Sequence, residues 1–188
     1  MRLKTKFCTA VIIFFLVLLA SFIICYRAQR SFFPVEHRAM VKKHAEEFDL
    51  DPLLVAAIIY SESRFDTRAV SVSSARGLMQ IMPGTGYDIA ARLQVEGFTE
   101  EDLFDQEINM RFGCYYISEM LKDFDSDITL ALAAYNSGPE NVRVWLEKKG
   151  NSSKNLAEDY PFSETRKYVK NVKRIHWLLG LCNKMIKS

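Results

Sequence analysis

The residue best placed for chemistry in this sequence is Glu62, in the stretch YSESRFD at residues 60–66. The residues before it are almost all apolar, and the period of a helix places Leu54, Ile58 and Glu62 on one face. Burial disfavours the charged form of a carboxyl group, so a Glu at the end of such a face can stay protonated near neutral pH and act as a general acid. The same pattern fits a Glu that merely reaches water at the end of its helix.

Three further stretches combine polar side chains with the expected boundaries of helices. Residues 75–86 read ARGLMQIMPGTG, with a Gly and then side chains of graded polarity directly before a helix start. Residues 134–139 read AYNSGP, with a Tyr and an Asn at a helix end, and residues 161–172 read PFSETRKYVKNV at the opening of the last helix. Each stretch alone is more typical of packing or of a turn than of a site.

In their order and spacing, the four motifs resemble the lytic transglycosylase domain, a family that shares its fold with goose-type lysozymes. The motifs are the Glu-Ser pair at 62–63, GLMQ at 77–80, AYN at 134–136 and ETRKYV at 164–169. The resemblance covers roughly residues 34–181. It implies a mainly α, lysozyme-like helical domain with a substrate cleft, and peptidoglycan glycan strands as the substrate.

The resemblance also implies a role for individual residues. Glu62 is expected to be the single catalytic acid and base. The residues expected to bind the glycan are Ser63, Ser71, Met79, Gln80, Tyr135, Asn136, Glu158 and Tyr168. The Tyr135 hydroxyl is expected to approach Glu62, and Glu158 rests on the least regular match. The run SVSSARGLMQ departs from the family's common SPxGAxGLMQ, and a positive φ at Ser74 would strain a residue other than Gly.

A single positioned carboxylate distinguishes this pattern from that of an ordinary glycosidase, which needs two. The resemblance implies that Glu62 protonates the oxygen between N-acetylmuramic acid and N-acetylglucosamine and then accepts the proton of the muramic C6 hydroxyl. The product is a 1,6-anhydromuramic end, formed without a cofactor or metal. The alternatives are a hydrolytic muramidase and a non-catalytic peptidoglycan-binding module of an envelope assembly.

The elements that must position these residues are helices, because the helical period dominates after residue 34 and strand alternation is nearly absent. Asp51 followed by Pro52 is a strong helix start. A structured loop is expected over 66–78, a helical turn from Thr99 and a second loop over 150–154. The pattern predicts helices over residues 35–48, 52 to about 61–64, 83–93, 105–121, 127–135, 139–149 and 163–186.

An uncharged apolar run, FCTAVIIFFLVLLASFIICY, occupies residues 7–26 and as a helix is about 30 Å long, enough to cross a bilayer. We expect residues 1–27 to form an uncleaved anchor with a short cytoplasmic tail, residues 28–34 a linker, and residues 35–188 the transglycosylase domain; a cleaved signal peptide is the alternative. The basic residues before the run favour a cytoplasmic N-terminus. A peptidoglycan substrate requires the same orientation, with one membrane span and the domain on the cell-wall side of the cytoplasmic membrane.

Charge and cysteine content narrow the possible partners. The net charge of the 188 residues is +2, but residues 1–30 hold five basic residues and no acid, so the remainder is mildly acidic. This distribution predicts no nucleic-acid partner. The four cysteines, at 8, 25, 114 and 182, lack a metal-binding spacing. A disulfide between Cys114 and Cys182 stays open, as do contacts with proteins of an envelope assembly.

Overall fold

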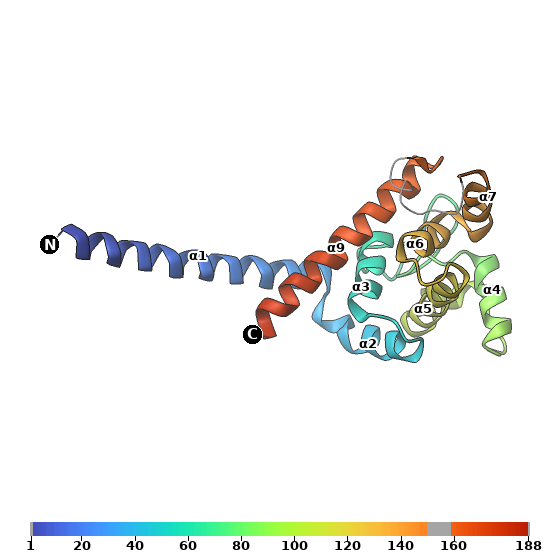
Figure 1. The fold of residues 1–188 in the computed structure, drawn as a ribbon. Coiled ribbons are helices and arrows are strands. Elements are labelled where there is room, and N and C mark those ends of the chain that lie inside the picture. The colour runs from blue at the N-terminus through green and yellow to red at the C-terminus, as the bar shows by residue number, and fades with distance from the viewer. Residues whose placement is uncertain (1, 150–158, 188) are drawn as a thin grey trace.

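The regular elements are all helices in the residues that the computed structural model describes, 2–149 and 159–187. The long helix α1 (Arg2–Phe32) projects from a body formed by the other helices (Figure 1). The predicted all-α fold class is therefore confirmed. The elements of the body are η1 (Val35–His37), α2 (Arg38–Glu47), α3 (Pro52–Glu62), α4 (Pro83–Arg92), η2 (Glu100–Phe104), α5 (Gln106–Asp123), α6 (Ile128–Ser137), α7 (Pro139–Lys149) and α9 (Ser163–Lys187).

Helix α3 begins and ends where the sequence predicts. The Asp51 side chain accepts a hydrogen bond from the backbone N–H of Leu53 at 2.9 Å, and Pro52 occupies the first helical position. The six residues 54–59 are buried, and each large aliphatic side chain among them contributes about 1.5–3 kcal/mol by leaving water. The helix is thus held rigidly in the interior, and its last residue is Glu62.

The core of the body lies between α3, α5, α6 and α9. Helix α6 buries six consecutive residues, 130–135, and its first turn is capped by Asp127, which accepts hydrogen bonds from the N–H groups of Thr129 and Leu130. Helix α9 packs against α3 and α6, and its C-terminal part lies beside α1 (Figure 1). The C-terminal helix therefore joins the interior of the body to the projecting helix.

Helix α1 extends through most of residues 28–34, the range expected to form a linker. Residues 7–33 contain neither Gly nor Pro, so nothing in the chain ends the helix before Phe32. The end of α1 packs on the body. The ring centroids of Phe32 and Tyr60 lie 4.7 Å apart, and the stacked rings of Phe33 and Phe65 have their centroids 6.4 Å apart. Helix α1 and the body are consequently in direct contact.

Smaller differences concern the boundaries of other elements. The single helix expected over 35–48 is divided into η1 and α2, and α5 and α6 each end two residues later than predicted. The loop expected over 150–154 lies outside the described residues. Cys114 and Cys182 are not joined, because Cys114 is buried in α5 whereas Cys182 lies beside Cys25 of α1.

Candidate active site

Glu62 faces a cavity of about 710 Å³ between the end of α3 and the N-terminal half of α9. The residue keeps partial exposure to this cavity, although protein atoms surround its carboxyl group closely enough to desolvate it. The cavity is lined by Ser61, Glu62, Ser71, Gln80, Asn136, Glu164, Lys167, Tyr168, Lys170, Asn171 and Arg174.

A second cavity, of about 250 Å³, continues the first. The two share Gln80 and Asn136 in their linings and are therefore adjacent parts of the candidate cleft. The second part is lined by Gln80, Ile81, Met82, Thr85, Tyr116, Tyr135, Asn136, Ser137 and Gly138. A cleft that extends away from Glu62 on one side suits an elongated substrate rather than a small compact one.

Burial raises the pKa of Glu62 to about 7, well above the ordinary value of 4.5 for a glutamate. The negative charge of Glu164, on the same cavity wall, raises this pKa further, and the Tyr168 hydroxyl lowers it. The Tyr168 hydroxyl is buried and has no partner at ordinary hydrogen-bond geometry, yet it lies near enough to Glu62 to stabilise the ionised carboxylate. Glu62 can therefore carry a proton at neutral pH and also tolerate its loss.

The GLMQ loop beside Glu62 is held by one buried side chain from α5. The Asn109 amide oxygen accepts the backbone N–H of Met79 at 2.7 Å, and its amide nitrogen donates to the carbonyls of Arg76 and Leu103, both at 2.8 Å. Gly77 has a φ of +74°, and a Cβ atom there would lie 2.3 Å from the Leu103 carbonyl oxygen. Only Gly fits at this position.

Further hydrogen bonds attach the loop to α3 and α6. The Ser63 hydroxyl donates to the Leu78 carbonyl at 2.8 Å, and the Tyr135 hydroxyl donates to the Met79 carbonyl at the same distance. The Gln80 amide donates to the carbonyls of Ala69 and Gly77, at 3.1 and 2.9 Å. The loop therefore keeps one conformation relative to Glu62 even though it has no regular secondary structure.

The structure brings most of the predicted site residues together. Glu62, Ser71, Gln80, Asn136 and Tyr168 line the larger cavity, and the next part of the cleft includes Tyr135. The pKa of the Tyr135 hydroxyl is raised well above its usual value by burial and then by the charge of Glu62, so the two groups are neighbours. The hydroxyl itself, however, is engaged with the Met79 carbonyl.

Two of the predicted residues, Met79 and Ser63, do not line either cavity. The Met79 side chain is completely buried against α5, where a Cβ atom on Gly113 would lie 2.3 Å from its sulfur. Met79 is absent from the lining of both cavities, and its contact with the glycan stays a prediction. Ser63 also lies outside the lining and ties α3 to the loop. Glu158 lies outside the described residues. Ser74 has a positive φ, +67°, the conformation that strains a residue other than Gly.

Comparison with known proteins shows to which family these features belong. Residues 39–157 match the family described as the transglycosylase SLT domain. The chain belongs to this family. Among solved structures, an inactive mutant of the lytic transglycosylase Slt from Pseudomonas aeruginosa is similar, with a TM-score of 0.72 and 34% identity over 79% of this chain and 24% of that chain. The 70-kDa soluble lytic transglycosylase in complex with bulgecin A gives a TM-score of 0.76 at 30% identity, over 82% and 25%.

Similar sequences include soluble and membrane-bound relatives of the SLT domain. The soluble lytic murein transglycosylase of Escherichia coli is 35% identical over 146 residues, which are 74% of this chain and 22% of that protein. The membrane-bound lytic murein transglycosylase C of Actinobacillus pleuropneumoniae is 29% identical over 161 residues, which are 74% of this chain and 44% of that protein. The chain spans about a fifth of the length of its soluble relatives.

The SLT-domain site includes residues that the sequence analysis missed. Most belong to α9, where Glu164, Lys167, Asn171 and Arg174 follow at intervals of three or four and so share one side of the helix. This spacing was visible in the sequence, but the orientation of the helix was not. Asn109 was missed because it contacts the GLMQ loop from about thirty residues away in the chain.

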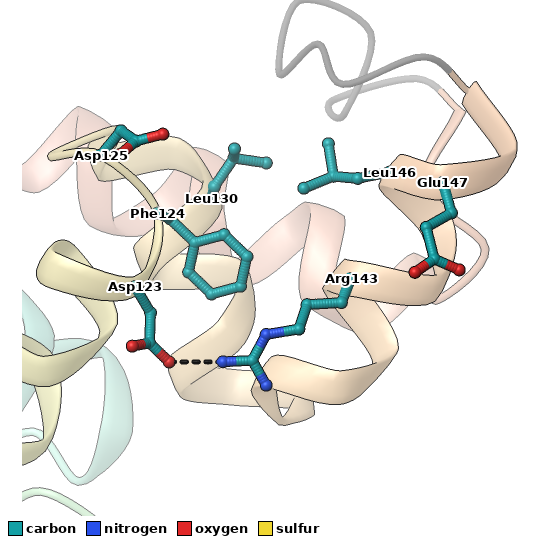
Figure 2. Close-up of a pocket in the computed structure, with 7 residues that line it drawn as sticks. All are labelled: Asp123, Phe124, Asp125, Leu130, Arg143, Leu146 and Glu147. Carbon is teal, nitrogen blue, oxygen red and sulfur yellow. Dashed lines mark hydrogen bonds and ion pairs between the residues drawn. The ribbon is translucent and has the colours of Figure 1, made fainter.

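A separate cavity lies between the end of α5 and α7 (Figure 2). Its residues are Asp123, Phe124, Asp125, Leu130, Arg143, Leu146 and Glu147. In this cavity Arg143 is paired with Asp123, and none of the predicted site residues is present (Figure 2). This cavity is separate from the one that contains Glu62 and plays no part in the chemistry derived from that residue.

Proposed function

We propose that this protein is a peptidoglycan lytic transglycosylase that cleaves the bond between N-acetylmuramic acid and N-acetylglucosamine without water and leaves 1,6-anhydromuramic ends. One observation carries this proposal: the carboxyl group of Glu62, at the end of a buried helix and beside an elongated cleft, has a pKa raised by burial to about 7. Membership of the SLT family and the names of the murein transglycosylases among its relatives support the assignment.

The raised pKa allows Glu62 to serve in both halves of the reaction. Protonated Glu62 gives its proton to the bridging oxygen as the bond to the anomeric carbon breaks, which leaves N-acetylglucosamine as the departing alcohol. The carboxylate so formed then accepts the proton of the muramic C6 hydroxyl, whose oxygen bonds to the anomeric carbon. Glu62 thus returns to its protonated state, and water is neither consumed nor released.

Neighbouring side chains favour this cycle. Desolvation keeps the proton on Glu62 before the bond breaks, and the otherwise unpartnered Tyr168 hydroxyl stabilises the charge that appears afterwards. Tyr135 and Met79 hold the GLMQ loop through the hydrogen bond between them, so that Gln80 and Asn136 stay at the junction of the two parts of the cleft. General acid and base catalysis by one such group contributes about 10²–10⁴-fold to the rate.

A hydrolytic muramidase is the second candidate, and Glu164 is the observation that favours it. Glu164 lines the same cavity as Glu62, so that the site contains two carboxyl groups, as in an ordinary glycosidase. In that reaction Glu164 would assist a water molecule and the product would carry a reducing end. In the transglycosylase reaction Glu164 acts only through its charge, which raises the pKa of Glu62.

Mass spectrometry of digested murein distinguishes the candidates, because an anhydro product is lighter than a reducing product by one water. We expect the full-length protein to release anhydromuropeptides, Glu62→Gln to release none, and Glu164→Gln to retain the anhydro product. Reducing ends from the unaltered protein would establish the muramidase instead. Binding to murein without any cleavage would indicate the non-catalytic module.

We further propose that α1 anchors the protein in the cytoplasmic membrane by a single span, with the SLT domain on the cell-wall side. The segment Val11–Phe32 is long and apolar enough to cross a bilayer, and every side chain from 11 to 20 is exposed. Some similar proteins carry the name membrane-bound. Intact mass of the protein extracted from membranes tests the anchor, since a cleaved signal peptide would remove the N-terminal residues. Protease digestion of intact spheroplasts tests the orientation.

A further inference from the structure

Three cations from α9 line the cavity that contains Glu62. Lys167, Lys170 and Arg174 follow at intervals of three and four residues and therefore project from the same side of the helix. All three are exposed, and none of them forms an ion pair with an acid anywhere in residues 2–149 or 159–187. When Glu62 is protonated, the cavity lining carries three positive charges and one negative charge, that of Glu164.

The guanidinium group of Arg174 is held beside the catalytic end of α3. The Ser61 hydroxyl donates to the Ala57 carbonyl at 2.8 Å, so its oxygen is free to accept the Asn171 amide N–H at 3.1 Å. The Asn171 carbonyl oxygen in turn accepts an N–H of Arg174 at 3.0 Å. This chain of bonds connects Arg174 to the residue next to Glu62.

The hydrogen bond to Asn171 leaves most N–H donors of the Arg174 guanidinium available to a ligand. One of its five N–H groups is used by Asn171, and a planar guanidinium presents the others in the fork that matches a carboxylate. Lys167 and Lys170 add two mobile ammonium groups on the same wall. The side of the cleft formed by α9 is therefore prepared for an anion, whereas the sugars of a glycan strand offer only neutral hydroxyl and acetamido groups.

We propose that Lys167, Lys170 and Arg174 form a carboxylate-binding site that recognises the peptide attached to the glycan strand. This inference rests on the proposed function, because the peptide reaches the site only when the strand occupies the cleft. In a peptide-bearing strand the muramic acid carries the peptide, and its free carboxylates are the anionic groups nearest to the bond that Glu62 cleaves. Peptide-bearing strands are then better substrates than bare ones.

The test compares three forms of one substrate with the full-length protein in detergent: sonicated murein, the same strands after an amidase has removed the peptides, and murein whose peptide carboxyls have been converted to amides. We expect kcat/KM for anhydro product release to be about fivefold higher on murein than on either of the other two, a factor within the range of three exposed ion pairs. Because such pairs are screened by salt, the preference should shrink between low and high ionic strength.

Variants assign the preference to the three residues. In the triple variant Lys167→Gln, Lys170→Gln, Arg174→Gln the ratio between murein and bare strands should fall below about twofold. The matched control is Lys173→Gln with Lys184→Gln, which removes two exposed cations of α9 outside the cavity and should retain the full ratio. If the triple variant fails to fold, the single variant Arg174→Gln, which leaves both lysines in place, tests the site through the same ratio between murein and bare strands.

The outcomes separate this inference from the proposed function. Any one of three results would overturn the carboxylate site and leave the transglycosylase assignment intact. They are equal rates of anhydro release from all three substrates, a preference that survives conversion of the carboxyls to amides, and a ratio that is unchanged in the triple variant. Absence of anhydro product from every substrate would overturn the transglycosylase assignment itself. A reduced ratio confined to the α9 cavity variants supports the site.

Discussion

Replacing Glu62 by Gln is expected to stabilise the folded protein at alkaline pH and to change its stability little at acidic pH. The amide has the shape of the protonated carboxyl group but cannot ionise. In the unaltered protein the pKa of Glu62 is about 7 in the folded state, because the group is buried, and 4.5 is the ordinary value for an exposed glutamate in the unfolded chain. Ionisation of Glu62 therefore opposes folding.

The size of the effect follows from the difference between these two pKa values. Below pH 4.5 Glu62 carries the proton in both the folded and the unfolded protein, so its ionisation does not lower the free energy of unfolding. Between pH 4.5 and about 7 the unfolded chain has lost the proton while the folded protein still holds it, so stability falls by about 1.4 kcal/mol for each pH unit. Above about pH 8 the loss is complete and amounts to about 3 kcal/mol.

Thermal unfolding followed by circular dichroism measures this difference. With the full-length protein in detergent, Tm of Glu62→Gln minus Tm of the unaltered protein should be near zero at pH 4.5 and about 6–12 °C at pH 8.5. Glu164→Gln is the matched control: it removes an exposed charge beside the same cavity and should show a much smaller dependence. A Tm difference that is the same at both pH values would refute the conclusion that burial raises the pKa of Glu62.

The pKa and the packing of the loop lead to four more predictions. The kcat/KM for glycan cleavage should fall tenfold per pH unit above about pH 7, because Glu62 must begin the reaction protonated. Tyr168→Phe should move this fall to higher pH, because the Tyr168 hydroxyl lowers the pKa of Glu62. Profiles of kcat/KM against pH check both predictions. Gly77→Ala should destabilise the protein by at least about 2 kcal/mol in chemical unfolding, through its positive φ and its contact with the Leu103 carbonyl. Asn109→Ala should cost about 3–5 kcal/mol in the same measurement, because three backbone groups lose their partner.

The features that the sequence predicted well are those determined within one helix. Helix α3 is an example, because its cap at Asp51, its Pro52 and its apolar face all lie within twelve residues of Glu62. The place of Glu62 at the end of an apolar helix face could accordingly be predicted from spacing, whereas its role as the acid followed from the resemblance of the motifs to a family. Its neighbours from distant segments, Gln80 and Asn136, could be inferred only from the resemblance of the motifs to a family.

The features that the sequence did not predict depend on how distant segments pack. The direction of the Met79 side chain is decided by Gly113, whose missing side chain leaves room for the sulfur in α5. A neighbour outside the GLMQ motif therefore determines where this side chain lies.

The strength of Glu62 as an acid likewise belongs to the tertiary structure rather than to the motif. Helix α6 contributes Tyr135 and helix α9 contributes Tyr168, both buried, and together with the end of α3 they remove water from one side of the carboxyl group. The remaining side stays open to the cleft, where α9 also presents Arg174 and the lysines. One helix therefore both desolvates the acid and forms the charged wall. A shift of α9 along its axis would change the pKa of Glu62 and the anion site together, which connects substrate recognition to acid strength through a single rigid element.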